Sequence, residues 1–416
     1  MSIDTRTRFH KDRRAIGVDE ILDEVVPTAI GVHGDLAARG IVYKQLPALG
    51  LEVAGRAVTL RAGDGATVLD TGTHDAGVTA ELDEDALSDL VQDIQSTMGL
   101  AMTSRVKITA GRLDDWIAWE PALRALFDGR PVYENGTMTF TDLDGGPLDL
   151  ERSFTPDDDR EEIAHFLTQA GFLHLRGVFG QAEMDAVSLE LDEWLARAEP
   201  DDGESWWART GDGTDLPVRV LWFHEKSDAT RALLHDERFQ WLADLTGDGH
   251  DGDNIGCEGL VKPLDIVTGL SDLPWHKDCG QGGHSYQCNA MTTGISVTGA
   301  DRMSGALGVI PGSHRANVMN TMRDPRTDLA SKLLETATGD VTVHCSDTMH
   351  RAYPPRERPR KVVYTGFRLR PLPGDEVRPD PRYGREARAA LTDVQQRIEN
   401  ADNADDDHHY RADPTR

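Results

Sequence analysis

Three features are scarce in this sequence: cysteine, basic residues and long apolar runs. Four cysteines occur among the 416 residues, and none forms the Cys-x-x-Cys pair that a structural zinc site usually needs. No stretch of roughly 18 apolar residues is present, so the sequence predicts no membrane span. We expect reduced, half-buried thiols at Cys257, Cys279, Cys288 and Cys345.

The shortage of basic residues gives the chain a strongly negative charge. Lysine and arginine total 44 against 72 aspartate and glutamate residues, which gives a net charge of -28. Such a field repels nucleic acids and anionic membranes, and no basic patch longer than a few residues offsets it. The charge is typical of a solvated acidic surface that aids solubility. No apolar segment typical of a signal peptide follows the N-terminus, so we expect a cytoplasmic protein.

The length exceeds the usual size of one hydrophobic core, which predicts more than one domain. Residues 139–161 are rich in glycine, proline and aspartate and read as a linker. We therefore expect an α+β domain at residues 1–150 and a second domain at residues 151–375. Residues 376–416 are charged and poor in large apolar side chains, which predicts a charged helix followed by a disordered acidic tail.

The two predicted domains differ in their patterns. Residues 51–72 alternate like strands joined by turns, whereas residues 83–99 place apolar residues at helical spacing. The second part opens with amphipathic helices, and from Gly259 onward it consists of short apolar runs separated by turn residues. That pattern predicts an antiparallel barrel or sandwich. Trp206 and Trp207 are expected in a Gly/Asp-rich loop, either as a lid over an apolar substrate or as packing residues.

One His-x-Asp pair is a candidate for metal binding. The pattern occurs at residues 10–12 and 33–35 as well, but only His276 and Asp278 stand between two strand-like runs of the second part. In an extended segment, residues two apart point to the same side, so an imidazole and a carboxylate can converge on one ion. A third ligand must then come from a neighbouring strand.

The segment DVTVHCSDTMHRAYPP offers His344 and His350 for this third position, and Arg360 follows at the start of the next strand. Two imidazoles and one carboxylate on one face of a metal leave the other positions open, which suits non-haem Fe(II) and O2 chemistry. The planar fork of an arginine suits the far carboxylate of a 2-oxo acid. Spacing alone leaves the choice between the two histidines open.

Taken together, the motifs resemble the phytanoyl-CoA dioxygenase family of Fe(II)- and 2-oxoglutarate-dependent oxygenases over roughly residues 158 to 371. The resemblance implies a double-stranded β-helix, a jelly-roll or cupin-like fold with flanking helices. It also implies that His276, Asp278 and His350 hold the iron and that Arg360 holds 2-oxoglutarate. The resemblance depends on these segments, in this order: EEIAHFLTQAGFLHLRGVFGQAEMDAV, PWHKD, SGALGVIPGSHR, GDVTVHCSDTMHRAYPP and RPRKVVYTGF.

The family pattern favours His350 over His344, because the arginine follows the iron-binding histidine by about ten positions in the family. Arg360 lies 10 residues after His350 but 16 after His344. His344 is then expected as a core residue or a neighbour of the ligands. Lys262 is a candidate contact of the 2-oxo acid, with a surface position as the alternative. The presence of Asp278 disfavours halogenation, since halogenating relatives replace this ligand with glycine or alanine.

The resemblance predicts an enzyme that hydroxylates an unactivated carbon of a small molecule and releases succinate and CO2. Desaturation or cyclisation by an oxygenase of the same class is an alternative. Residues from about 30 to 140 are similar to the sterol carrier protein family, which implies a tunnel for a lipid or acyl ligand. The substrate could then be lipid-like or carrier-bound. Two alternatives stay open, a lipid carrier with a degenerate oxygenase domain and a first domain that serves only for packing.

Overall fold

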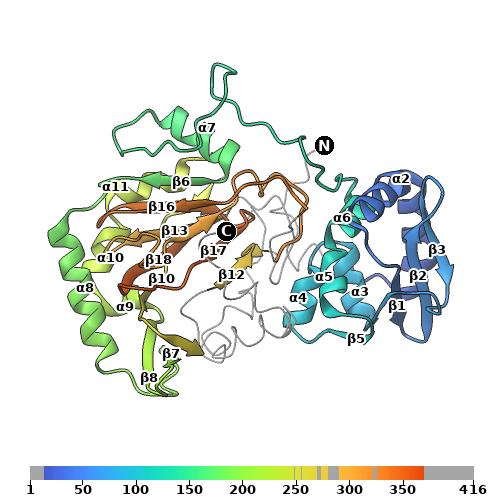
Figure 1. Cartoon of the computed structure of the whole chain (residues 1–416), viewed down its shortest axis with the longest axis horizontal. Helices are drawn as coiled ribbons and strands as arrows, with labels where there is room; N and C mark the ends of the chain where they lie inside the picture. Colours follow the sequence, from blue (N-terminus) through green and yellow to red (C-terminus); the bar gives the residue numbers. More distant parts are fainter. Residues whose placement is uncertain are drawn as a thin grey trace.

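The computed structural model shows an N-terminal α+β part beside a larger, mostly β part (Figure 1). Cys288 and the predicted C-terminal segment, residues 376–416, lie outside the described residues. No helix in the described part of the chain is long and apolar enough to cross a membrane. The structure describes residues 14–247, 249–253, 255–268, 273–279, 290–321 and 326–369.

The N-terminal part contains a mixed sheet with strand order β3-β2-β1-β4-β5. Strands β1 and β4 run parallel, and the other neighbouring pairs are antiparallel. Strand β4 is buried at every position but one, which fits its central place near β1. The strands are β1 (Leu49–Val53), β2 (Arg56–Ala62), β3 (Thr67–Thr71), β4 (Val78–Leu82) and β5 (Val106–Ala110).

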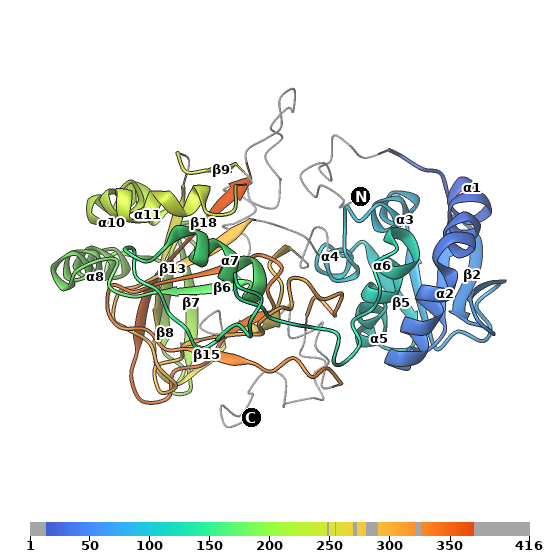
Figure 2. The same ribbon diagram turned by 90° about the horizontal axis from the view of Figure 1, so that it is seen from above.

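Helices pack around this sheet and close its core (Figure 2). Asp83 caps α3 by accepting a hydrogen bond from the Ala86 amide, and Ser96 caps α4 in the same way through the Gly99 amide. Trp116 and Trp119 are fully buried in the core. The helices are α1 (Val18–Glu20), η2 (Ile21–Val25), α2 (Val26–Lys44), α3 (Glu84–Val91), α4 (Thr97–Met102), α5 (Leu113–Ala118) and α6 (Glu120–Asp128).

The second part is built on a large sheet with strand order β11-β7-β8-β10-β18-β13-β16-β6, in which neighbours are antiparallel. The short strand β9 pairs with the end of β18. The strands are β6 (Phe172–Leu175), β7 (Ser205–Thr210), β8 (Asp215–Val220), β9 (His250–Asp251), β10 (Cys257–Lys262), β11 (Ile266–Thr268), β13 (Met291–Ser296), β16 (Val341–Cys345) and β18 (Arg360–Leu369).

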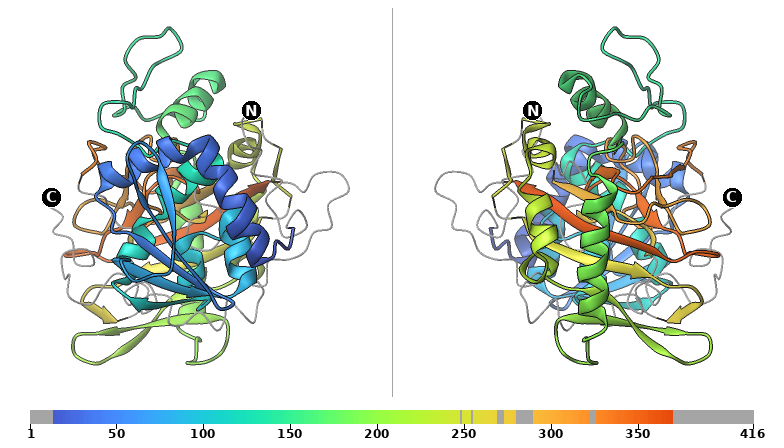
Figure 3. Two further views of the ribbon diagram at one scale, coloured as in Figure 1. Left: turned by 90° about the vertical axis from the view of Figure 1, so that its right-hand side faces the viewer. Right: turned by 90° about the vertical axis from the view of Figure 1, so that its left-hand side faces the viewer.

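One face of this sheet is apolar and is covered by helices. Figure 3 shows α8 lying across the strands, and Lys361 on β18 reaches out to Asp192 of that helix at 2.6 Å. Because side chains alternate along a strand, Arg360 points to the opposite face. The covering helices are α7 (Arg160–Ala170), α8 (Gln181–Leu195), α9 (Phe223–Lys226), α10 (Asp228–Leu234), α11 (Glu237–Gln240) and η3 (Trp241–Asp244).

A smaller sheet, in the order β12-β17-β14-β15, completes the second part. Its strands are antiparallel and short. The predicted mostly β jelly-roll with flanking helices, preceded by an α+β region, is confirmed. The strands of the smaller sheet are β12 (Leu273–His276), β14 (Leu307–Val309), β15 (Lys332–Leu334) and β17 (His350–Ala352).

The expected loop at Trp206 and Trp207 is wrong, because both residues lie in strand β7. Trp206 is buried, and the Arg219 guanidinium stacks over its ring at 4.6 Å from the ring centroid. The glycine and aspartate residues that suggested a loop belong to the turns at the two ends of the strand. One of these residues, Gly213, has a φ of +89° between β7 and β8.

The turn before β16 depends on Gly339 and Asp340. Gly339 has a φ of +85°, and a Cβ at this position would lie 1.9 Å from the Phe179 carbonyl oxygen, so only glycine fits. Asp340 is buried and accepts hydrogen bonds from His174 and from the Gly177 amide, both at 2.8 Å. These contacts fix the point at which β16 enters the sheet.

A segment at residues 315–321 connects the two parts of the chain. The Asn317 side chain donates hydrogen bonds to the carbonyl oxygens of Pro121 and Arg130, at 2.8 and 3.0 Å. Met319 packs into the apolar core of the N-terminal part. Thr321, at the other end of the segment, forms a β-bridge with His276. This segment therefore links the N-terminal part to strand β12, which ends at His276.

Candidate active site

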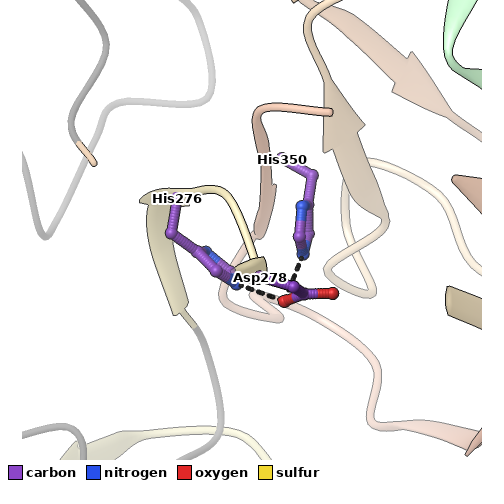
Figure 4. A group of neighbouring side chains, drawn as sticks. All are labelled: His276, Asp278 and His350. Carbon is purple, nitrogen blue, oxygen red and sulfur yellow. Dashed lines mark ion pairs between the residues drawn. The ribbon is translucent and has the colours of Figure 1, made fainter. Parts of the chain in front are cut away.

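His276 and His350 lie side by side where two strands of the smaller sheet pair. His276 ends β12, His350 begins β17, and the two residues are direct partners in the antiparallel register. Their ring centroids are 4.1 Å apart, and both side chains are buried. Figure 4 shows both rings pointing at Asp278. The strand pairing thus brings together two histidines that are far apart in the sequence.

The protein backbone fixes the orientation of both imidazoles. His276 Nδ1 lies 2.7 Å from the Pro274 carbonyl oxygen, and His350 Nδ1 lies 2.9 Å from the Thr348 carbonyl oxygen. A carbonyl can only accept a hydrogen bond, so each Nδ1 carries the proton and each Nε2 presents a lone pair. This is the state in which a neutral histidine binds a metal.

Asp278 completes the group. Its Oδ1 lies 3.4 Å from His276 Nε2 and 3.6 Å from His350 Nε2, and one potential ligand atom from each residue lies within 4.8 Å of the other two. The Asp278 side chain is 36% exposed, against 3% for His276 and 7% for His350. The three potential ligand atoms therefore lie close together, and the group is exposed to solvent mainly at the Asp278 carboxylate.

The electrostatics of the group favour an ionised Asp278 carboxylate beside a neutral His350 imidazole. Burial raises the pKa of Asp278, but His350, His276 and His344 together outweigh burial, and the pKa of Asp278 lies well below its ordinary value. Burial, aided by His344 and His276, lowers the pKa of His350 well below its ordinary value. Both shifts favour the protonation states that bind a divalent cation.

Arg360 and Lys262 form a second polar site on the inner face of the large sheet. They are direct partners across the antiparallel pair β10–β18, and both are buried. Arg360 donates to the Gly305 carbonyl oxygen at 2.7 Å, and Lys262 Nζ donates to the Tyr353 carbonyl oxygen. The surface alternative for Lys262 is therefore wrong. Two adjacent buried cations are costly unless an anion joins them.

Arg360 also has unused hydrogen-bonding capacity. Its Nε is buried without a hydrogen-bond partner, and the guanidinium forms no ion pair within the described ranges. Two other arginines, Arg356 and Arg358, stand just before Arg360 in the sequence. Arg358 is 62% exposed and pairs with Asp301, while Arg356 is exposed. Only Arg360 therefore points into the interior.

Tyr364 and Thr292 are polar residues of this interior that the sequence did not single out. Arg360 Nη2 donates to the Tyr364 hydroxyl at 3.2 Å, and Thr292 donates to Asp278 Oδ2 at 2.8 Å. A Cβ at Gly294 would lie 3.1 Å from the Tyr364 ring, so the glycine leaves space for that ring. The sequence alone does not reveal which face of the sheet such a polar side chain occupies; the strand pairing is needed to establish it.

Three further residues lie beside the candidate ligands in sequence or in space: Trp275, Ser313 and His344. Trp275 packs in an apolar cluster with Tyr133 and lies edge-on to Tyr353 at 6.4 Å between ring centroids. Ser313 accepts a hydrogen bond from the Met349 amide at 2.7 Å, which braces the residue before His350. His344 lies beside the candidate ligands, 3.7 Å from Asp278 Oδ2. Both candidates for the third ligand, His344 and His350, therefore lie close to the Asp278 carboxylate.

This arrangement defines a jelly-roll protein with a candidate centre for one metal ion and a buried cationic site nearby. A family model described as phytanoyl-CoA dioxygenase matches residues 167–361. Residues 167–361 therefore form a phytanoyl-CoA dioxygenase domain, the domain type of iron- and 2-oxoglutarate-dependent oxygenases. Residues 1–166 lie outside the match. No curated protein sequence matches the chain significantly.

Several solved structures match part of the chain at low sequence identity and with TM-scores below 0.5. The epimerase SnoN, in complex with Fe3+, alpha ketoglutarate and nogalamycin RO, is 20% identical, with a TM-score of 0.41 over 53% of this chain and 92% of that chain. EctD from S. alaskensis, with 2-oxoglutarate and 5-hydroxyectoine, is 18% identical, with a TM-score of 0.42 over 58% and 82%. The carbocyclase SnoK is 19% identical, with a TM-score of 0.40 over 54% and 91%. The family assignment rests on the sequence match.

Proposed function

We propose that His276, Asp278 and His350 bind Fe(II), that Arg360 binds the distal carboxylate of 2-oxoglutarate, and that the enzyme hydroxylates an unactivated carbon of a small molecule. The observation that carries the proposal is the convergence of two backbone-anchored imidazoles on one oxygen of Asp278. Two imidazoles and one carboxylate on one side suit Fe(II) and leave positions open for other ligands. Succinate and CO2 are the expected co-products.

The chemistry of the donor set fits the metal. The Nε2 atoms of His276 and His350 both face Oδ1 of Asp278, and the pKa of Asp278 lies well below its ordinary value, so that the carboxylate is ionised. Bound Fe(II) supplies the electrons that activate O2, with 2-oxoglutarate as the co-substrate that is decarboxylated. The protein orients both imidazoles through backbone carbonyls, and it leaves the carboxylate side of the group accessible.

The buried cations fit 2-oxoglutarate. A carboxylate between Arg360 and Lys262 would neutralise charge that the described residues around Arg360 leave uncompensated. The free Nε of Arg360 and the Tyr364 hydroxyl add polar groups at the same place. We propose Lys262 and Tyr364 as further contacts of the distal carboxylate, with Arg360 as its main anchor.

An anaerobic titration tests the proposal. Fe(II) and 2-oxoglutarate, added to the metal-free protein, should give a visible charge-transfer band and, in air, release succinate. His276→Ala should lose both. His224→Ala is the matched control, because His224 is a partly exposed histidine on α9, outside the group. Absence of iron binding by the unmodified protein would refute the proposal.

Product analysis tests the reaction outcome. Gain of one oxygen atom by the substrate supports hydroxylation, whereas loss of two hydrogen atoms supports desaturation or cyclisation. A screen of candidate small molecules for stimulated succinate release identifies the substrate. The residues proposed to bind iron and 2-oxoglutarate would serve hydroxylation, desaturation and cyclisation alike. The position of the substrate in the site would therefore decide which reaction occurs.

We propose residues 1–150 and 151–375 as the two domains, with the first as a sterol-carrier-like unit for a lipid-like or acyl ligand. Two distinct apolar cores support the division, although Met319 of the second part packs into the core of the first. Solvent extraction of the purified protein followed by mass spectrometry tests the ligand. Bound lipid without any succinate release would favour a carrier over an oxygenase.

A further inference from the structure

A third histidine lies at the candidate metal centre. His344, on β16, is 1% exposed, and its ring centroid is 4.1 Å from that of His350. Strand β16 pairs with β13 so that His344 is the direct partner of Thr292. Both side chains therefore stand on the same inner face of the large sheet, next to Asp278.

The hydrogen bonding of His344 differs from that of the other two histidines. Neither its Nδ1 nor its Nε2 has a hydrogen-bond partner in the described part of the chain. By contrast, Nδ1 of His276 and of His350 is bonded to a backbone carbonyl. A buried imidazole without a hydrogen bond is costly and needs an explanation.

The two oxygens of Asp278 have different neighbours. Oδ1 faces the Nε2 atoms of His276 and His350, at 3.4 and 3.6 Å. Oδ2 instead accepts the Thr292 hydroxyl at 2.8 Å and lies 3.7 Å from His344 Nε2. Each carboxylate oxygen has more than one lone pair, so Oδ2 can accept a second hydrogen bond.

We propose that His344 is a positioning residue that, together with Thr292, holds Oδ2 of Asp278 and leaves Oδ1 alone for the metal. In this arrangement His344 carries its proton on Nε2 and donates a hydrogen bond to Oδ2. The distance between the two atoms must shorten by less than about 1 Å to bring the pair within hydrogen-bond range. The inference rests on the proposed iron site. It gives His344 a role distinct from those of His276 and His350.

The expected consequence is a carboxylate that coordinates through one oxygen. A carboxylate that coordinated through both oxygens would occupy a position that the bidentate 2-oxo acid needs. Hydrogen bonds to a ligating carboxylate fix its orientation, and loss of such a contact typically weakens metal binding by roughly 10- to 100-fold. The positioning pair thus affects both the affinity for the metal and the room for 2-oxoglutarate.

Paired variants at both positions test the proposal. His344→Phe removes the N–H and keeps an aromatic ring, while His344→Gln keeps an N–H donor. Thr292→Val removes the hydroxyl and keeps the shape, while Thr292→Ser keeps the hydroxyl. We expect anaerobic Fe(II) affinity to fall by roughly 10- to 100-fold in His344→Phe and Thr292→Val, and to stay within a few-fold of wild type in the two conservative variants.

A second readout is the charge-transfer band of the Fe(II)/2-oxoglutarate complex. At saturating Fe(II), His344→Phe should need more 2-oxoglutarate to develop the band, and His344→Gln should not. The melting temperature of the metal-free protein shows whether His344→Phe folds; if it does not, Thr292→Val carries the same test independently.

Distinct results would overturn the inference. Unchanged Fe(II) affinity in His344→Phe and Thr292→Val would show that both residues only pack. Equal losses in His344→Gln and His344→Phe would show that the ring binds the metal itself. Failure of the proposed iron site is distinguishable, because the unmodified protein would then bind no Fe(II) at all.

Discussion

Replacing Arg360 with lysine keeps a positive charge on the inner face of the large sheet but removes the planar fork. The guanidinium donates to the Gly305 carbonyl oxygen and to the Tyr364 hydroxyl, which holds it in one orientation, and its Nε remains for another acceptor. A lysine at this position can neither span these groups nor bind a carboxylate in a bidentate manner.

The size of the effect follows from the loss of hydrogen bonds to a charged group. Such bonds contribute about 1.5–3 kcal/mol, which corresponds to a roughly 10- to 150-fold higher requirement for 2-oxoglutarate in Arg360→Lys. Iron affinity should be nearly unchanged, because the candidate ligands come from β12, β17 and the residues after β12, whereas Arg360 begins β18.

The assay is a 2-oxoglutarate titration of succinate release at saturating Fe(II), with Arg358→Lys as the matched control. Arg358 stands two residues earlier, is 62% exposed and pairs with Asp301, so its variant should titrate like wild type. A large shift in Arg358→Lys and none in Arg360→Lys would refute the reasoning. An equal loss of iron affinity in Arg360→Lys would show that the substitution acts through folding.

Two further substitutions test the turn before β16. Gly339→Ala should lower the free energy of unfolding by more than Gly213→Ala in chemical denaturation, because both glycines have a φ near +90° but only a Cβ at Gly339 meets the Phe179 carbonyl oxygen. The Gly213 variant should cost about 1–3 kcal/mol, and equal losses would show that the contact does not matter. Asp340→Asn should cost about 1.5–3 kcal/mol near neutral pH. Burial raises the pKa of Asp340, but hydrogen bonds from His174 and backbone amides outweigh burial and place that pKa below its ordinary value of 3.8. The carboxylate therefore stabilises the fold above about pH 4 and less as the pH falls further, so wild type and variant should converge in acid denaturation, and a pH-independent difference would contradict this.

Much of the second part could be predicted because its strands are short apolar runs with turn residues between them. Helix α2 was not predicted, because its sequence contains Pro27 and several glycines, residues that are typical of turns and helix ends. In the structure Gly40 lies against Val132, and a Cβ at position 40 would be 2.3 Å from the Val132 side chain. Close packing thus outweighs helix propensity at this position.

The sequence predicted the candidate metal ligands, but it did not predict which residues lie beside them. The spacing of His276 and Asp278 predicted that both residues lie on one strand and point to a common side; β12 in fact ends at His276, and Asp278 reaches the same place from the following turn. The family pattern favoured His350 over His344. The place of His344 could not be derived, because β16 is buried at every position and shows no alternation that would mark its inner face. Thr292 becomes its neighbour only through the register of β13 with β16.

The segment at residues 315–321 contacts the first part of the chain at one end and the strand of His276 at the other. Its Asn317 is bonded to backbone carbonyls of the first part, and its Thr321 is bridged to His276. A shortened protein that begins at residue 151 would expose Met319 and lose both hydrogen bonds of Asn317. Removal or exchange of the first part would therefore take away contacts that support the segment paired with His276 from the outside.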